Sequence, residues 1–261
     1  MLYGIKIEIC AGNLEDIRTA EKYSEVDRVE VNSHLEHDGL SMDHDDFLEA
    51  RKISSKQLMS MVRPRAGSFI YTYEEKEKML EEAQYFMAHG ADGIVFGCLT
   101  EQKEIDVPFT EAMIKLIHSE QKEAVFHKAF DKTSDFFKSA QVLADLHCDR
   151  ILTSAGKPDC SAGSEILHAL EEQYETRIQI LPGGGINAGN LLSILHQTGC
   201  TRFHMSLRAA DPEQKLVDVL EALRASHHSQ QHILTGEDQE MFEEDRYEET
   251  MEPQEDTHDH E

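Results

Sequence analysis

Short apolar runs alternate with longer amphipathic stretches from Ile5 to Ser226. The runs are five to seven residues long and mostly apolar, which is typical of parallel strands covered on both faces by helices. They predict eight strands: Ile5–Cys10, Arg28–Asn32, Gln57–Arg63, Gly93–Gly97, Ala124–Phe130, Arg150–Ser154, Ile178–Pro182 and Arg202–Ser206. In the stretches between them, apolar residues recur at helical spacing. These stretches predict helices at Leu14–Ser24, His44–Ile53, Glu74–His89, Pro108–Ser119, Asp135–Leu146, Glu165–Tyr174, Ala188–Gln197 and Glu213–Ser226.

Eight strand-then-helix units with short connections predict a single-domain, TIM-like (β/α)₈ barrel. Each right-handed crossover lays the next strand beside the last, so the eighth strand can return to the first. An open, doubly wound sheet is the alternative, but it would leave two edge strands. None of the eight runs has the interior proline of an edge strand, since Pro64 and Pro182 fall only at strand ends. The α/β barrel should therefore occupy residues 1–226.

The last 35 residues, 227–261, have a different composition. They contain 13 Asp or Glu residues against one basic residue, Arg246, and show little apolar periodicity. Such a segment buries too little surface to offset the entropy lost on ordering. We therefore expect a disordered acidic tail after the barrel.

Charge and cysteine usage restrict the function classes. The chain has 51 acidic and 25 basic residues, which argues against nucleic acid or an anionic membrane surface as a partner. No apolar run approaches the ~18 residues of a membrane-spanning helix, and the first ten residues lack the features of a signal peptide. The five cysteines are widely spaced with no Cys-x-x-Cys pair, so we expect reduced thiols in a cytoplasmic protein. An exposed apolar helix face could support a homodimer, although the pattern does not single one out.

Ionisable residues collect at the predicted C-terminal ends of the strands, where parallel α/β folds keep their chemistry. After the fifth strand, His127 and Asp131 share a parity and should face one cavity, while Lys128 should face the other way. The same parity argument groups residues on other strands: Glu8 with Cys10, Glu30 with Asn32, Arg63 with Arg65, and His204 with Ser206.

Charged groups inside a barrel must be paired, because an unpaired buried charge is too costly. Ion pairing with no chemistry is one reading of this group. The other is a site for proton transfer or lyase-type chemistry on a small anionic metabolite. In that site His127 would be the acid or base, Glu8 or Glu30 its partner and Arg63 an electrophilic clamp, with Asp131 beside them. Arg65 would join Arg63 in binding a carboxylate or phosphate, or else lie on the surface.

A glycine run after the seventh strand is a second candidate for anion binding. Gly183, Gly184 and Gly185 let backbone N–H groups approach a ligand, and the next helix would add a positive dipole end. Loops after strands seven and eight often hold phosphate in such barrels. Asn187 and Ser206 lie in these two loops, while a tight turn is the simpler explanation of the glycines.

The chain resembles the CutC family of copper homeostasis proteins. The resemblance covers about Ile5 to Arg208 and rests on motifs in a fixed order: Glu8-Ile-Cys10, Arg28-Val-Glu30, His37-Asp-Gly-Leu40, Arg63-Pro-Arg65, Gly90-Ala-Asp-Gly93, Phe126-His-Lys-Ala-Phe-Asp131, Arg150-Ile-Leu-Thr-Ser154, Pro182-Gly-Gly-Gly185 and Phe203-His204. It implies a TIM-like barrel, a cytoplasmic location and a part in copper tolerance, with no settled reaction. Through these motifs Thr153 and His204 join the expected ligand-binding residues.

The resemblance also implies copper(I) binding, which the family's cysteines have been held to provide. One of them corresponds to Cys10, but the second position is Asn32, which is not a soft donor. Lys128 stands where the family usually has arginine. Three functions therefore stay open: a copper(I)-binding protein, an enzyme acting on a small anionic metabolite, and a module that binds such a ligand without turnover.

Overall fold

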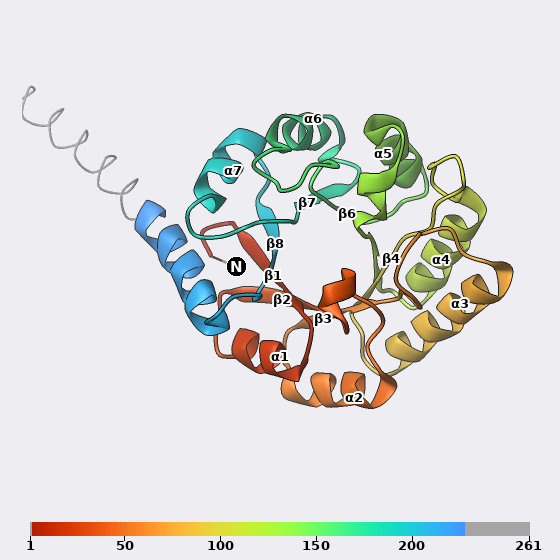
Figure 1. Ribbon diagram of the computed structural model, residues 1–261, viewed down its shortest axis with the longest axis horizontal. Helices are drawn as coiled ribbons and strands as arrows, with labels where there is room; N and C mark the ends of the chain where they lie inside the picture. Colours follow the sequence, from red (N-terminus) through yellow and green to blue (C-terminus); the bar gives the residue numbers. More distant parts are fainter. Residues whose placement is uncertain (1, 228–261) are drawn as a thin grey trace, which may run out of the picture.

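The computed structural model describes residues 2–227, in which eight parallel strands form the wall of a barrel surrounded by helices (Figure 1). The hydrogen-bonded order is β7-β6-β5-β4-β3-β2-β1-β8, so chain neighbours are also neighbours in space and the last strand returns to the first. The strands are β1 Lys6–Ala11, β2 Val26–Val31, β3 Gln57–Met61, β4 Gly93–Phe96, β5 Glu123–Phe126, β6 Arg150–Thr153, β7 Gln179–Pro182 and β8 Arg202–Ser206.

The ring of strands is nearly closed. β7 and β8 are joined by one parallel bridge, between Gly183 and His204, which is just past the last residue of β7. The other seven interfaces are parallel ladders, with one register shift, between Ile7 and Glu8 in the pairing of β1 with β2. The predicted (β/α)₈ barrel is thus confirmed, and the open doubly wound sheet is not found.

Helices follow the strands as the apolar periodicity predicts. They are α1 Leu14–Glu21, α2 His44–Ile53, α3 Tyr73–Ala88, α4 Val107–Ser119, α5 Phe136–Asp145, α6 Ser164–Tyr174 and α7 Leu191–Thr198, with a further helix over 212–227. Two short 3₁₀ turns, η1 Leu35–His37 and η2 Lys128–Lys132, lie in loops. Several starts are set by side-chain caps: Asn13 accepts hydrogen bonds from two backbone N–H groups of α1, and Thr72 forms a capping box with Glu75 of α3.

The fifth strand is shorter than predicted, ending at Phe126 instead of Phe130. The imidazole Nδ1 of His127 accepts a hydrogen bond from the N–H of Ala129 and so caps the 3₁₀ turn that begins at Lys128. The apolar run continues through this turn because Ala129 and Phe130 are fully buried, which is why periodicity could not locate the end of the strand.

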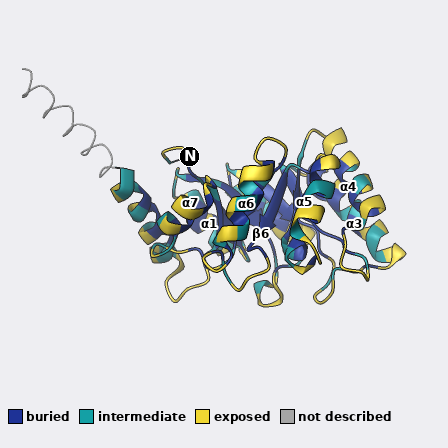
Figure 2. Ribbon diagram, turned by 90° about the horizontal axis from the view of Figure 1, so that it is seen from above, coloured by how far each residue is buried: buried dark blue, intermediate teal, exposed yellow. Residues whose placement is uncertain are grey.

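Two apolar regions stabilise the fold. The larger fills the space between the outside of the barrel and the helices, and Figure 2 shows the strands as the buried layer within an exposed outer surface. The smaller lies inside the barrel, where six side chains close the lumen below the mouth: Met59, Met61, Val95, Val125, Leu152 and Leu181. The mouth is therefore a closed-bottomed recess, as expected when barrel interiors are packed.

The predicted tail, 227–261, lies outside the described residues except for its first residue. Among residues 2–227, none of the helices combines the length and the apolar character needed to cross a bilayer.

Candidate functional site

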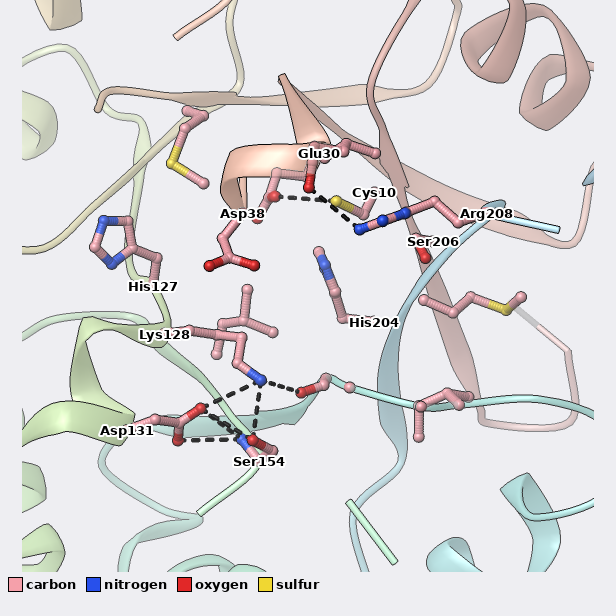
Figure 3. Close-up of a pocket in the computed structure, with 18 of the residues that line it drawn as sticks. Cys10, Glu30, Asp38, His127, Lys128, Asp131, Ser154, His204, Ser206 and Arg208 are labelled. Atoms are coloured by element: carbon pink, nitrogen blue, oxygen red, sulfur yellow. Dashed lines mark hydrogen bonds and ion pairs between the residues drawn. The ribbon is translucent and has the colours of Figure 1, made fainter. Parts of the chain in front are cut away.

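A cavity of about 510 Å³ opens at the C-terminal ends of the strands, where the sequence predicts the chemistry (Figure 3). Its lining includes ten of the predicted site residues: Cys10, Glu30, Arg63, His127, Asp131, Gly183, Gly184, Gly185, His204 and Ser206. Four others lie outside the lining: Glu8, Arg65, Thr153 and Asn187. The convergence predicted from strand parity is thus found for most of the set, and the cavity is large enough for a small metabolite.

Below the cavity, a chain of buried ion pairs runs through the barrel. It starts at His204, whose Nδ1 lies 2.7 Å from Oε1 of Glu8. The other oxygen of Glu8 accepts from Nε of Arg28 at 2.5 Å, and Arg28 also donates to both carboxylate oxygens of Glu123, each at 2.8 Å. Arg150 completes the chain with Nε 3.1 Å from Glu123. Since Glu123 and Arg150 are the first residues of β5 and β6, the chain reaches the end of the barrel opposite the cavity.

These pairs set the protonation of the two groups nearest the cavity. Burial alone would raise the pKa of Glu8, but the Arg28 guanidinium and the His204 imidazole outweigh it and hold this pKa well below its usual range. Burial alone would lower the pKa of His204, but the carboxylates of Glu30 and Glu8 raise it. Glu8 is therefore a fixed negative charge that keeps His204 in place, and ion pairing accounts for it without a direct role at the ligand.

Cys10 and Glu30 meet at the floor of the cavity through the register of β1 and β2. The thiol lies 3.6 Å from Oε1 of Glu30, and the Asn32 amide donates to the same oxygen at 2.8 Å. Burial together with the Glu30 and Glu8 carboxylates raises the pKa of the Cys10 thiol well above its usual value. Burial and the Glu8 charge also raise the pKa of Glu30.

Cys10, Glu30 and His204 could together hold a metal ion, since one ligand atom from each lies within 4.8 Å of the others. They form the one such group found among residues 2–227. The donor set is mixed, because the thiol and the imidazole suit copper(I) whereas a carboxylate suits harder ions. Cys98, which follows β4, and Cys160, in the loop after β6, are fully buried and do not line the cavity.

Basic side chains dominate the cavity wall. Six line it (Arg63, Lys128, Lys132, Lys157, Arg208 and Lys215), against three carboxylates (Glu30, Asp38 and Asp131). In the whole chain the ratio is reversed, with 25 basic and 51 acidic residues. The cavity is thus a locally cationic site in a strongly acidic protein, which is the arrangement that attracts an anion.

Lys128 corrects the sequence-based expectation that it faces away from the cavity. Because β5 ends at Phe126, the 3₁₀ turn carries Lys128 to the cavity wall, where its ammonium donates to Ser154 Oγ at 2.9 Å and to the Gly183 carbonyl at 3.1 Å. It also pairs with Asp131 at 3.3 Å. Figure 3 shows Lys128, Asp131 and Ser154 as one connected group.

Asp131 lines the cavity but is occupied in holding the loop after β6. Its carboxylate accepts hydrogen bonds from the Thr153 hydroxyl, from the hydroxyl and N–H of Ser154, and from the N–H of Gly156. This explains why Thr153 is fully buried behind the cavity instead of lining it. Thr153 therefore shapes the site from behind the wall, whereas Asp131 is part of the wall itself.

The glycine run lines the cavity beside Lys128. Gly184 and Gly185 both have positive φ, +131° and +72°, a conformation that other residues rarely adopt. A Cβ on Gly184 would lie 3.2 Å from the Lys128 ammonium. The expected helix dipole is farther away, because α7 begins only at Leu191, after a turn in which Asn187 hydrogen-bonds to Gly185 and Gly189. Positive charge at this wall therefore comes from side chains.

The guanidinium of Arg63 donates most of its hydrogen bonds to loop carbonyls. Its Nη1 donates to the carbonyls of His37 and Gly39, at 2.8 and 2.9 Å, and its guanidinium lies over the Phe69 ring. Arg65 turns outward to Glu75 and to loop carbonyls. The predicted pair of anion-binding arginines is therefore split, with Arg63 alone at the cavity.

His127 differs from a proton-transfer group. Burial and the neighbouring Arg63 lower the pKa of His127 to about 3, so its imidazole is neutral near pH 7. Since Nδ1 accepts from Ala129, the ring proton is on Nε2. A neutral imidazole of this kind is suited to donating a hydrogen bond.

Six charged cavity residues were not among the predicted site residues: Asp38, Lys128, Lys132, Lys157, Arg208 and Lys215. Arg208 was named only as the end of the stretch that the family resemblance covers. Lys132 and Lys157 follow β5 and β6, and Lys215 comes from the helix over 212–227, so strand parity could not place them. Asp38 lies in the loop after β2, in a motif used only for the family resemblance.

Comparison with known proteins agrees with the fold and with that resemblance. The model of the CutC family matches residues 5–209. The chain is 39% identical to a CutC family protein of Treponema denticola, over 81% of this chain and 85% of that one. It is 36% identical to a CutC family protein of Glaesserella parasuis, over 88% and 93% of the two chains. A solved structure described as the putative copper homeostasis protein CutC from Streptococcus agalactiae has 32% identity and a TM-score of 0.71, over 77% of this chain and 98% of that one.

Proposed function

The chain belongs to the CutC family, and we propose that it binds a small anionic metabolite, carrying a phosphate or carboxylate group, at the mouth of the barrel. The observation that supports this most is the concentration of charge: six of the 25 basic residues surround one cavity of about 510 Å³. Basic side chains that repel one another are kept together at a cost, and an anion would offset that cost.

The wall formed by Lys128 and the glycine run is the part best suited to the anionic group. The Lys128 ammonium is fixed by Ser154, Gly183 and Asp131 and so cannot swing away from the cavity. The exposed side chains of Lys132 and Lys157 have no bonded partner among the described residues. Phosphate sites combine such groups: one fixed ammonium, two free ammonium groups and the exposed backbone of the glycine run.

Binding of inorganic phosphate tests the proposal, with chloride at equal ionic strength as the reference. We expect phosphate to raise the melting temperature of the protein, since a ligand at 100 times its Kd adds about 2.7 kcal/mol to the stability. Lys157→Met should weaken phosphate binding by roughly tenfold, the loss of one charge-assisted hydrogen bond. Lys115→Met is the matched control, because Lys115 lies on α4 and, among residues 2–227, pairs only with Glu111. Equal shifts with phosphate and chloride, or equal loss in both variants, would contradict the proposal.

Whether the protein converts its ligand or only binds it is decided by what becomes of the ligand after incubation. A screen of phosphorylated metabolites by thermal shift identifies ligands, and mass spectrometry after incubation shows whether each is converted. Recovery of every ligand unchanged identifies a binding module, and a product that disappears with His204→Asn identifies an enzyme.

Copper(I) binding is a second candidate, favoured by the cluster of Cys10, Glu30 and His204 and by the description of the similar Streptococcus agalactiae structure as a putative copper homeostasis protein. Cys10 and Nε2 of His204 would supply the soft donors, since Nδ1 faces Glu8. The high pKa of Cys10 means that copper(I) would have to displace a proton from the thiol.

Titration of the reduced protein with copper(I) against a chromogenic chelator tests this candidate. We expect Cys10→Ala to lose one copper(I) per chain while Cys148→Ala, a buried cysteine outside the cavity, retains it. Equal competition by both variants would exclude the site. We also propose a cytoplasmic location, because the five cysteines are all free thiols.

A further inference from the structure

The carboxylate of Asp38 differs from the other two at the cavity because no described residue is bonded to it. The carboxylate of Asp131 already accepts hydrogen bonds from the end of β6 and the loop that follows it. Glu30 is buried, hydrogen-bonded to Asn32, and has a raised pKa. Asp38 is exposed, and Figure 3 shows its carboxylate pointing into the cavity.

The backbone around Asp38 is fixed in a conformation that presents this carboxylate. Asp38 has φ +64° and ψ +28°, in the left-handed region. The carbonyls on either side of it, from His37 and Gly39, are both held by one guanidinium, that of Arg63. Gly39 also packs so closely on Asn32 that an added Cβ would lie 2.6 Å from the Asn32 amide oxygen.

Two backbone hydrogen bonds between Ser33 and Leu40 close the loop at its base, at 2.8 and 2.9 Å. The backbone that carries Asp38 is thus held in place, although its carboxylate has no bonded partner among the described residues. A residue held in the left-handed region at a cavity, with an unpaired carboxylate, is a reasonable candidate for a functional residue, because such conformations cluster at functional sites.

From this arrangement we infer that Asp38 selects the ligand, and that the ligand is a phosphorylated polyol or sugar whose hydroxyl groups donate to this carboxylate. The inference rests on the proposed anion site and names its substrate class. A phosphate monoester suits six basic side chains better than a singly charged carboxylate does. Opposite the phosphate, one free carboxylate among so many cations favours neutral hydroxyl donors over an ammonium group, which those cations would repel.

Paired ligands of equal chain length isolate the contribution of the hydroxyls. Glycerol 3-phosphate and ribitol 5-phosphate carry them, whereas propyl phosphate and pentyl phosphate do not. We expect wild type to bind at least one polyol phosphate about tenfold more tightly than its alkyl partner by isothermal titration calorimetry, the effect of one hydrogen bond to a charged acceptor. Asp38→Ala should lose this preference and still bind the alkyl phosphates as wild type does. Asp45→Asn, an exposed carboxylate of α2 outside the cavity, is the control and should keep the preference.

Arg63 acts here as a positioning residue, so Arg63→Lys tests the presentation of Asp38. A lysine cannot hold both carbonyls with a planar fork, so the variant should lose the polyol preference, which is the ratio of its affinities for the polyol phosphate and the alkyl phosphate of equal length. A general loss of folding would instead weaken both ligands together.

The outcomes separate the two proposals. Alkyl phosphates that bind wild type, with no hydroxyl preference or with one that survives in Asp38→Ala, would overturn the role of Asp38 and leave the anion site standing. Tighter binding of 2-aminoethyl phosphate than of the polyol phosphates would overturn the substrate class. Failure of wild type to bind any of these phosphates would overturn the anion site and this inference together.

Discussion

Replacing Arg28 by methionine should destabilise the barrel strongly, because Arg28 is the central link of the buried ion-pair chain. Its side chain is 3% exposed and bridges Glu8, also 3% exposed, to Glu123, which is 26% exposed. Methionine fills much of the space of the arginine stem, so the cavity left behind is small. The main effect is electrostatic: Glu8 keeps only His204 as partner.

This geometry gives the size of the loss in unfolding free energy expected for Arg28→Met. Removing one partner of a buried pair costs about 3–5 kcal/mol, since an uncompensated charge remains in the interior. Most of this should come from Glu8, because Glu123 is partly exposed and still pairs with Arg150. Lys115→Met, which breaks the exposed pair with Glu111, is the control and should cost no more than about 0.5 kcal/mol.

The destabilisation should also depend on pH. In wild type the pKa of Glu8 is lowered by folding, so its contribution to stability is present above the ordinary value of 4.5 and is lost as the pH falls below it. In Arg28→Met, burial is no longer opposed by a guanidinium, and the pKa of Glu8 should rise. Protonation then neutralises the unpaired charge, so the variant should lose less stability at about pH 5 than at about pH 7.

Urea unfolding followed by far-UV circular dichroism measures these differences, because the chain has no tryptophan. The double variant Glu8→Gln with Arg28→Met should recover most of the loss, since the charge is removed together with its partner. A cost equal to that of Lys115→Met, or one that is the same at both pH values, would refute the reasoning.

Three further predictions concern the cavity. Gly185→Ala should cost more stability than Gly199→Ala and should weaken phosphate binding. Both glycines have positive φ, which costs an alanine about 1–2 kcal/mol, but only at Gly185 would the new Cβ meet another group, 2.8 Å from Asp159. Urea unfolding of both variants measures the difference. His127 should stay neutral to below about pH 4 in an imidazole NMR titration, and a titration near pH 6.5 would contradict this. Because its pKa of about 3 lies below the ordinary 6.5, the unfolded chain binds the extra proton, and the stability should fall as the pH drops below 6.5. His127→Gln should remove that part of the fall. Arg65→Ala should leave the Kd for phosphate unchanged in calorimetry, since its guanidinium is paired with Glu75 outside the cavity, and a tenfold loss would return Arg65 to the site.

Periodicity and parity predicted the barrel and part of its site because both depend on local sequence. Alternation along β1, β2 and β8 correctly turned Cys10, Glu30 and His204 inward, and the parallel register then brought them together.

The remainder depended on places where the regular elements stop. Lys128 reaches the cavity only because a 3₁₀ turn replaces the predicted end of a strand. Asp38 reaches it through a left-handed loop held by Arg63, an interaction between residues 24 to 26 positions apart in the chain. Tertiary contacts of this kind leave no periodic signal in the sequence. The predicted homodimer and the predicted acidic tail stay predictions, since they concern surfaces and residues outside the barrel core.

The central claim, that the mouth of the barrel is an anion site, is tested most directly by locating a heavy oxyanion in crystals. Tungstate has the shape and charge of phosphate, and its anomalous scattering identifies it without ambiguity. The account predicts, in crystals grown without phosphate, a tungstate peak inside the cavity, within hydrogen-bonding distance of the Lys128 ammonium and the Gly184–Gly185 backbone. Tungstate found only on surface lysines, with the cavity filled by water at the same concentration, would contradict it.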